Sequence, residues 1–210
     1  MAFFTKQQLS EKEHLYKINL INSLSGYKSA NLIGSISKEG IENVAVFSSV
    51  MHLGSNPPVL GFVLRPTTVP RNTYKNIKET GVFTINHVYE DIINDAHHTS
   101  AKYPEAISEF DMTDLKAEFK KGFIAPFVQK SPVQIAMKYV EEYHIKVNGV
   151  LLIVGEIQSV FIDDDLLQDD GFVNLSKGKV ATINGLDGYA IPKLYTRNEY
   201  QRPKQKIEIK

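Results

Sequence analysis

The sequence predicts a mainly β protein: a single closed or nearly closed β-barrel with a few helices added to it. Many short segments rich in β-branched and aromatic residues follow one another, with Gly, Asn and Pro between them, which is typical of successive strands. An Asn-Gly pair at 148–149 also separates two long extended runs, which is a strong hairpin signal. Short strands joined by tight turns favour a barrel with helical additions.

The length and charge of the chain limit its organisation and its partners. Its 210 residues suit one domain, 1–210, with a sizeable core. Lys plus Arg and Asp plus Glu number 24 each, so no excess positive charge attracts nucleic acid or an anionic membrane. The absence of cysteine excludes disulfides and thiolate chemistry and fits a cytoplasmic location. The amino terminus lacks the features of a secretory signal, and no apolar run reaches membrane-spanning length.

The first half of the chain predicts one short helix followed by strands. Residues 5–14 are polar and charged, and Ser10 and Glu13 offer a capping box for a short surface helix. A hairpin turn is expected at Glu39-Gly40. The strands expected from β-branched and aromatic content are 16–24, 30–37, 44–49, 58–64 and 81–88.

Helices are expected where the strand pattern breaks. Asn72 is a candidate N-cap for a helix over residues 73–80, and Gly81 stands where a helix commonly ends in the left-handed conformation. Residues 90–112 mix helical spacing with a proline, which predicts a helix, a turn and a second short helical segment. The candidate caps within this segment are Ser108 and Asp111.

The second half of the chain returns to strands. Residues 131–147 and 149–163 are extended apolar runs joined by the Asn148-Gly149 pair, so they predict a hairpin. The acidic segment 163–171 is expected to be a surface loop. The two chain ends are expected to form an N-terminal extension and a loose tail, at residues 1–15 and 200–210.

One loop gathers groups that could hold an anion. The stretch SSVMHLGSNPP at 48–58 carries hydroxyls and small residues, so its backbone N–H groups can approach a ligand. Ser48 and Ser49 add hydroxyl donors, while Arg65 and Arg71 suit bidentate phosphate contacts. Further donors near the next helix, whose dipole favours negative charge, are Thr67, Thr68 and Thr73. The alternative is an ordinary turn, which such a composition forms more often.

Other kinds of site find little support. The chain has neither a Gly-x-Gly-x-x-Gly motif nor a P-loop motif, which disfavours a doubly wound dinucleotide domain. No nucleophile elbow occurs either. His97 and His98 follow Asp95, but adjacent side chains on a helix diverge by about 100° and rarely ligate one ion together. No metal site is therefore predicted.

Five segments carry a resemblance to a known family. They are GIENVAVFSSVMHLGSNPPVLGFVLRP, RNTYKNIKETGVFTINHV, AHHTSAKYPEAISEFDM, SPVQIAMKYV and VLLIVGEIQSVFI. In this order they resemble the flavin reductase-like proteins of the FMN-binding split-barrel superfamily, which includes flavoredoxins and the reductase components of two-component monooxygenases. The similarity extends from about Ser25 to about Tyr195. The resemblance implies a six-stranded Greek-key split barrel, a homodimer, and FMN at the subunit interface.

The resemblance also implies which residues form the flavin site. A Ser/Thr pair at the flavin and its phosphate, with its two neighbours, corresponds to Phe47, Ser48, Ser49 and Val50. On the phosphate side the corresponding residues are Arg65, Arg71 and Thr73. The order of the segments places a further set near the ring or the ribityl chain: Asn31, Thr99, Ser100, Ala101 and Lys102.

The implied function is an FMN-binding oxidoreductase that transfers hydride from NADH or NADPH to flavin. No side chain need act as acid or base in that step, so no catalytic residue is assigned. The alternatives are a flavoredoxin-like FMN electron carrier without direct NAD(P)H oxidation and a barrel without ligand. A monooxygenase is a candidate electron acceptor. The loop departs from the reductase branch at Met51, His52 and Leu53, and a nicotinamide-contacting histidine would come from His52, His97, His98 or His144.

Overall fold

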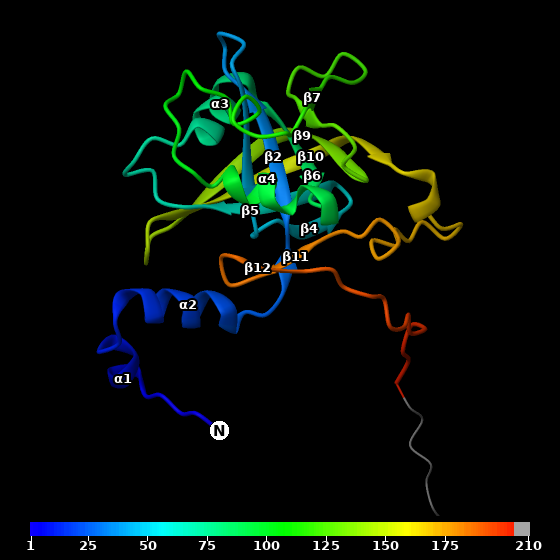
Figure 1. The fold of residues 1–210 in the computed structure, drawn as a ribbon. Coiled ribbons are helices and arrows are strands. Elements are labelled where there is room, and N and C mark those ends of the chain that lie inside the picture. The colour runs from blue at the N-terminus through cyan, green and yellow to red at the C-terminus, as the bar shows by residue number, and fades with distance from the viewer. Residues whose placement is uncertain (204–210) are drawn as a thin grey trace, which may run out of the picture.

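The computed structural model describes residues 1–203, and its main element is one antiparallel sheet of seven strands (Figure 1). The strand order is β3-β2-β6-β9-β10-β5-β4. These strands are β2 (Asn31–Ile36), β3 (Glu42–Phe47), β4 (Met51–Ser55), β5 (Pro58–Leu64), β6 (Val82–His87), β9 (Val133–Ile145) and β10 (Val150–Ile162). The mainly β fold class is therefore confirmed. Strand β4, at one edge, lies in the segment for which the sequence predicted only a loop.

The sheet must curl because its two edge strands follow one another in the sequence. β3 ends at Phe47 and β4 begins at Met51, so residues 48–50 connect opposite edges. Four Cα steps reach at most about 14 Å, whereas a flat sheet of seven strands is roughly 29 Å wide. The strands therefore wrap round until the edges approach, and the segment 48–50, which we call the seam, is where they meet.

Both faces of the central strands are buried. Along β2, Ile33 belongs to one core and its neighbour Leu32 to the other, because successive side chains of a strand point to opposite faces. The inner core contains Ile33, Phe62, Leu64, Ile77, Phe83, Ile85, Val133, Ile135, Met137, Leu151 and Ile153. The outer core contains Ala30, Leu32, Val44, Val88, Ala96, Phe110, Leu115, Val128, Ala181 and Ile183. Strands buried on both faces explain the nearly continuous apolar runs in the sequence.

The helix α3 (Asn72–Thr80) follows β5 and ends as the sequence predicts. Gly81 adopts the left-handed conformation with φ of 74°, and its N–H donates to the Ile77 carbonyl. The start differs from the prediction, because Arg71 is the N-cap and Asn72 is the first helical residue. The side chain of Arg71 makes no capping hydrogen bond, so the first N–H groups of α3 receive no acceptor from the N-cap residue.

Polar contacts hold α3 against β2 and β3. Asn76 donates to the Ser35 hydroxyl at 3.2 Å, and Thr73 accepts from the Asn43 amide at 3.1 Å. All four side chains are buried, so each bond satisfies groups that water does not reach. These two contacts fix α3 relative to β2 and β3.

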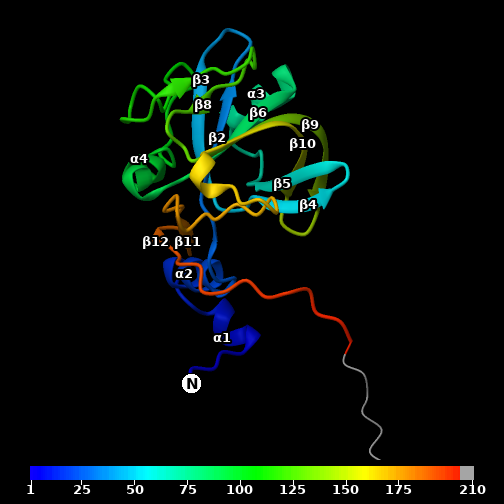
Figure 2. The ribbon, with the colours of Figure 1, turned by 90° about the vertical axis from the view of Figure 1, so that its right-hand side faces the viewer.

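The prediction of a strand at 16–24 is wrong, because this segment lies in the helix α2 (His14–Leu24). Its β-branched content suggested a strand, but Leu15, Ile18, Ile21 and Leu24 recur every third residue, which is a helical spacing. The preceding helix α1 (Lys6–Ser10) has Thr5 and Gln8 as its capping box, in place of the predicted Ser10 and Glu13. Both helices lie on the side of the molecule opposite α3 (Figures 1 and 2).

The segment after β6 contains less helix than the sequence predicts. It forms η1 (Glu90–Ile92) and α4 (Ile93–His98), but only turns follow, so the second helical segment is wrong. Within these turns Ser108 accepts a hydrogen bond from the Phe110 N–H. The predicted Asn148-Gly149 hairpin is confirmed between β9 and β10, with Gly149 at φ of 73°.

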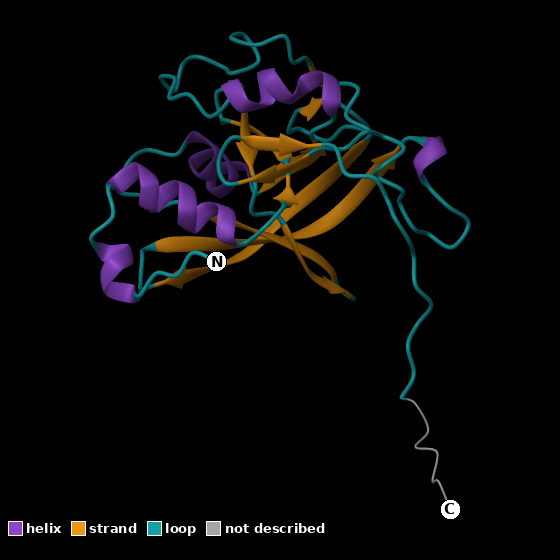
Figure 3. Ribbon diagram, turned by 60° about the horizontal axis from the view of Figure 1, so that its bottom comes forward, coloured by secondary structure: helices purple, strands orange, loops and turns teal. Residues whose placement is uncertain are grey.

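Several short elements complete the fold around the central strands (Figure 3). A second sheet and a two-stranded pair, both missed by the sequence analysis, consist of β1 (Lys28–Ser29), β11 (Thr182–Asn184), β12 (Gly188–Ala190), β7 (Ala117–Glu118) and β8 (Phe127–Val128). The acidic loop contains η2 (Asp164–Leu166). Most of the predicted tail, residues 204–210, lies outside the described residues. Between residues 1 and 203, no helix combines the length and apolar character needed to cross a bilayer.

Candidate functional site

The seam brings the predicted residues Phe47 to Val50 beside the end of β5. The Ser49 hydroxyl donates to the Val63 carbonyl and accepts from the Val63 N–H, each at 3.0 Å. Its single proton is therefore used within the fold. The Val50 carbonyl accepts from the hydroxyl of Ser29 at 3.2 Å. Ser48 is half-buried beside them, and Arg65 follows Val63 by two residues.

A row of side chains crosses three strands next to the seam. Asn31 on β2 lies opposite Phe47 on β3 and opposite His87 on β6. Directly opposed residues of an antiparallel sheet share a face, so the three side chains line one face together. Asn31 is buried and donates to the Ser29 hydroxyl at 2.9 Å. We call Phe47, Asn31 and His87 the cross-strand row.

His87 was missed as a site residue by the sequence reasoning. Its Nδ1 atom is enclosed and has no hydrogen-bond partner among residues 1–203. Burial lowers the pKa of the imidazole to about 4, so the ring is neutral near pH 7. The signal that could have found it is the alternation of Phe83, Ile85 and His87 within the strand predicted at 81–88, which places the histidine on the face of two core residues.

The predicted residue Thr99 lies at the open edge of β3, where its hydroxyl has a structural partner. It accepts from the Val46 N–H at 2.9 Å and donates to the Ala96 carbonyl at 2.7 Å. Glu109 accepts from the Val44 N–H at 3.1 Å on the same edge. Burial raises the pKa of Glu109, and its backbone hydrogen bonds oppose this effect. The three residues that follow Thr99 are exposed: Ser100, Ala101 and Lys102.

Two predicted residues lie at the other end of β3. Thr73 contacts Asn43 at the start of β3, and Arg71 precedes it as the N-cap of α3. The Arg71 Nε atom is buried without a hydrogen-bond partner in the described chain. The first turn of α3 contains no acidic residue. An unpaired guanidinium beside uncapped helical N–H groups suits an anion, because both present donors and positive charge.

The structure therefore divides the predicted site between the two ends of β3. Asn31, Phe47 and the seam residues lie at one end, and Arg71 and Thr73 lie at the other. Asn43 and Phe47 are separated by about 13 Å along the strand. They point to the same face, as does Ala45 between them, and Ala45 is only partly buried. This face of β3 therefore connects the start of α3 at one end to Phe47 at the other.

The histidines that the sequence left open lie on the surface. His52 contacts the Ser55 hydroxyl at 3.1 Å, and His97 contacts Tyr189 at 3.2 Å. His98 contacts Tyr103 at 2.6 Å, and His144 is exposed on β9. A role for any of them toward nicotinamide stays a prediction. In the described part of the chain, no three His, Asp or Glu side chains gather as metal ligands would.

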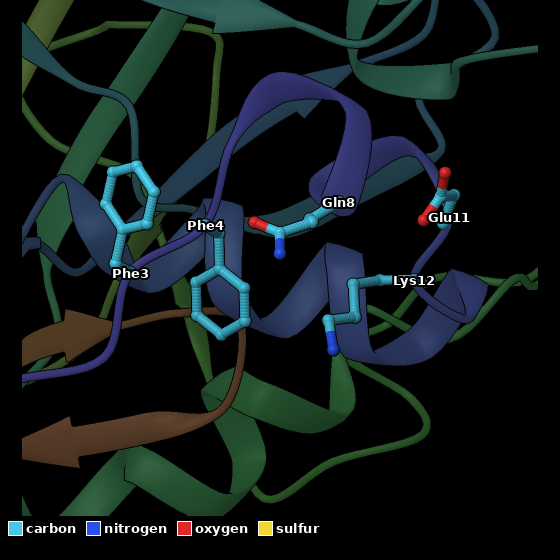
Figure 4. Close-up of a pocket in the computed structure, with 5 residues that line it drawn as sticks. All are labelled: Phe3, Phe4, Gln8, Glu11 and Lys12. Atoms are coloured by element: carbon cyan, nitrogen blue, oxygen red, sulfur yellow. The ribbon is translucent and has the colours of Figure 1, made fainter.

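Two surface hollows lie apart from these residues. One is at the N-terminal extension, lined by Phe3, Phe4, Gln8, Glu11 and Lys12 (Figure 4). The other is lined by Asp95, Asp111, Met112, Thr113 and Asp114. Neither hollow includes a residue of the cross-strand row, the seam or the start of α3, so neither belongs to the candidate site.

Comparison with known sequences identifies the family. The sequence model for the flavin reductase like domain matches residues 26–203. The chain belongs to the flavin reductase-like family. This match covers the sheet, the seam and the start of α3, so the elements of the candidate site all lie within the family domain. The resemblance found in the sequence is confirmed.

Solved structures of similar fold agree with this family. A split barrel domain protein from Shewanella frigidimarina NCIMB 400, provisionally named a flavin reductase, is 42% identical with a TM-score of 0.93, over 96% of this chain and 100% of that one. The flavoredoxin of Desulfovibrio vulgaris (Miyazaki F) is 22% identical with a TM-score of 0.72, over 83% and 92%. The FMN-binding protein from Thermus thermophilus is 15% identical with a TM-score of 0.68, over 82% and 90%.

The edge contact of Thr99 predicts that this residue supports the fold. Thr99→Val keeps the shape of the side chain but leaves the Val46 N–H without its acceptor, which should cost about 1 to 3 kcal/mol of unfolding free energy. Thr99→Ser keeps the hydroxyl and should lie close to the wild-type protein. Urea unfolding measures the difference. A Thr99→Val variant as stable as Thr99→Ser would show that the hydroxyl does not hold the β3 edge.

Proposed function

We propose that this flavin reductase-like protein is an FMN-dependent oxidoreductase that transfers hydride from NADH or NADPH to flavin. The single observation that carries the cofactor assignment is the buried, unpaired Nε atom of Arg71 at the uncapped start of α3. A buried N–H donor without a partner is costly unless a ligand pairs with it. A phosphate supplies both the charge and the acceptor oxygens that this position needs.

The face of β3 fits the shape of FMN. FMN is elongated, with a phosphate at one end and an aromatic ring at the other. The start of α3 would hold the phosphate, and the small, partly buried Ala45 would lie beside the middle of the ligand. Phe47 and Asn31 would lie at the ring end, where Phe47 packs edge-on against Phe62 with ring centroids 5.0 Å apart. Packing against the inner core would therefore hold Phe47 in place at the end of the site that binds the flavin ring.

The bound flavin supplies the hydride-accepting chemistry, and the protein's residues position it. Asn31 is held by Ser29 and the sheet ladder, so its carbonyl oxygen has a fixed location as an acceptor. Arg71 and the N–H groups of α3 fix the phosphate, which restricts how the ring can move. No side chain of this set needs to take or give a proton for the hydride to pass.

A cytoplasmic location and an acceptor such as a monooxygenase stay predictions.

A homodimer is part of this proposal. Strand β4 forms the edge of the sheet beside the seam. Its side chains Met51 and Leu53 are 40% and 42% exposed to solvent. The β9–β10 hairpin exposes further apolar side chains: Val140, Tyr143, Ile145 and Val147. Apolar side chains gathered beside a ligand site are typical of a surface that a partner covers. A second copy seated there would cover the ring end of the flavin.

The reaction can be tested on the purified full chain. Supplied with FMN and freed of excess, the protein should keep a yellow flavin spectrum, which should bleach on anaerobic addition of NADH or NADPH. Retained FMN that neither nucleotide bleaches would instead support the flavoredoxin-like electron carrier. Protein that retains no flavin and shows no thermal shift with FMN would contradict both, since a ligand of the folded state raises its stability.

Arg71→Met should distinguish the phosphate contact from contacts to the ring. Loss of a charge-assisted hydrogen bond costs about 1.5 to 3 kcal/mol, so the Kd for FMN should rise by about tenfold to a hundredfold. Riboflavin, which lacks the phosphate, should bind both proteins equally. Flavin fluorescence quenching measures both affinities. Arg197→Met, at an arginine paired with Asp170, is the matched control. An equal loss of riboflavin and FMN binding would place Arg71 away from the phosphate.

Sedimentation should show a species of twice the 23.7 kDa chain mass. Leu53→Glu puts a charge on the exposed β4 edge and should shift the protein toward monomer, because a buried unpaired carboxylate is unfavourable. Ile124→Glu, at an exposed apolar residue between β7 and β8, should leave the mass unchanged. A wild-type monomer with full FMN occupancy would contradict the dimer.

A further inference from the structure

His87 is the one residue of the cross-strand row that has no role in the proposed function. It ends β6, opposite Asn31, and its own carbonyl accepts from the Ser131 hydroxyl at 2.8 Å. Two inter-strand spacings, about 10 Å, separate its Cα from that of Phe47. The backbone of His87 is therefore fixed by the sheet ladder and by Ser131, and its side chain lies on the face that carries Asn31 and Phe47.

The imidazole of His87 differs from the other buried polar groups near it. Asn31 donates to Ser29, and Asn86 donates to the Leu32 carbonyl while accepting from the Val128 N–H. The residue His87 as a whole is only partly buried, yet its Nδ1 is enclosed and lacks a partner within residues 1–203. A buried polar nitrogen without a partner costs free energy. A residue kept only for packing would gain from being apolar.

The protonation state of His87 sets what it can recognise. Burial holds the pKa of the ring near 4, so the imidazole is uncharged at neutral pH. A neutral imidazole carries one N–H donor and one acceptor nitrogen. It suits a neutral group that offers both donors and acceptors, and it offers no charge to a phosphate. The polar edge of the flavin ring has this chemistry, with carbonyl oxygens and a ring N–H side by side.

We propose that His87 binds the polar edge of the flavin ring through Nδ1 and so completes the ring end of the site with Asn31 and Phe47. This assignment rests on the proposed flavin function. It assigns two kinds of recognition to different residues: Arg71 contacts the phosphate, and His87 contacts the ring. The two contacts give opposite predictions for riboflavin, which has the ring and lacks the phosphate.

His87→Leu, His87→Asn and His97→Leu test the assignment by flavin fluorescence quenching on the full chain. His87→Leu removes the nitrogen and should raise the Kd for FMN and for riboflavin by the same factor, about tenfold. His87→Asn places an amide close to the Nδ1 position and should recover most of the affinity. His97→Leu alters a surface histidine that contacts Tyr189 and should change neither Kd. Near-UV circular dichroism checks that each variant is folded.

A second measurement on the wild-type protein covers the case in which His87→Leu does not fold. Long-range proton–nitrogen NMR spectra resolve histidine ring nitrogens, and the Nδ1 signal of His87 should move when either FMN or riboflavin is added. Wild-type flavin binding with an unmoved Nδ1 signal, or with unchanged affinity in folded His87→Leu, would overturn the assignment alone. A wild-type protein that binds neither flavin would overturn the proposed function, and this assignment with it.

Discussion

The seam, residues 48–50, is the constraint on which the rest of the structure depends. It joins the two edges of a seven-stranded sheet across three residues, so the sheet cannot lie flat. The Ser49 hydroxyl forms hydrogen bonds with both the N–H and the carbonyl of Val63. This hydroxyl, which the composition suggests for a ligand, instead attaches the seam to β5. Ligand contacts must come mainly from other groups, in the cross-strand row and at the start of α3.

Strand β3 positions the groups of the candidate site because its two faces have different neighbours. One face carries Val44 into the outer core. The opposite face, through Asn43, Ala45 and Phe47, connects the start of α3 to the cross-strand row. A ligand lying along that face would span both ends. In the proposed site, the sheet ladder would supply the rigidity, and side chains at two separated points would supply the specificity.

The sequence was informative where one physical signal dominated. The apolar run 58–64 matches β5 in both bounds, and Gly81 marks the end of α3. The signal failed where two effects competed. In α2, the β-branched residues led to the prediction of a strand, although the spacing of the apolar residues is helical. In β4, both faces are largely exposed, so the strand lacks the alternation of buried and exposed residues. The family segments named Asn31, Phe47 and the seam residues, which the structure brings together. His87 lies in a predicted strand, but only the structure shows that its Nδ1 atom is enclosed without a partner in residues 1–203.

The open edge of β3 also bears on the behaviour of the protein at high concentration. Thr99 and Glu109 occupy the Val46 and Val44 N–H groups, which on an unprotected edge would pair with a strand from another molecule. Within the described residues, no side chain makes such a hydrogen bond to the backbone of Met51 or Leu53 on the β4 edge. Strand addition is thus hindered at the β3 edge, and the proposed self-association would use the β4 edge beside the candidate site.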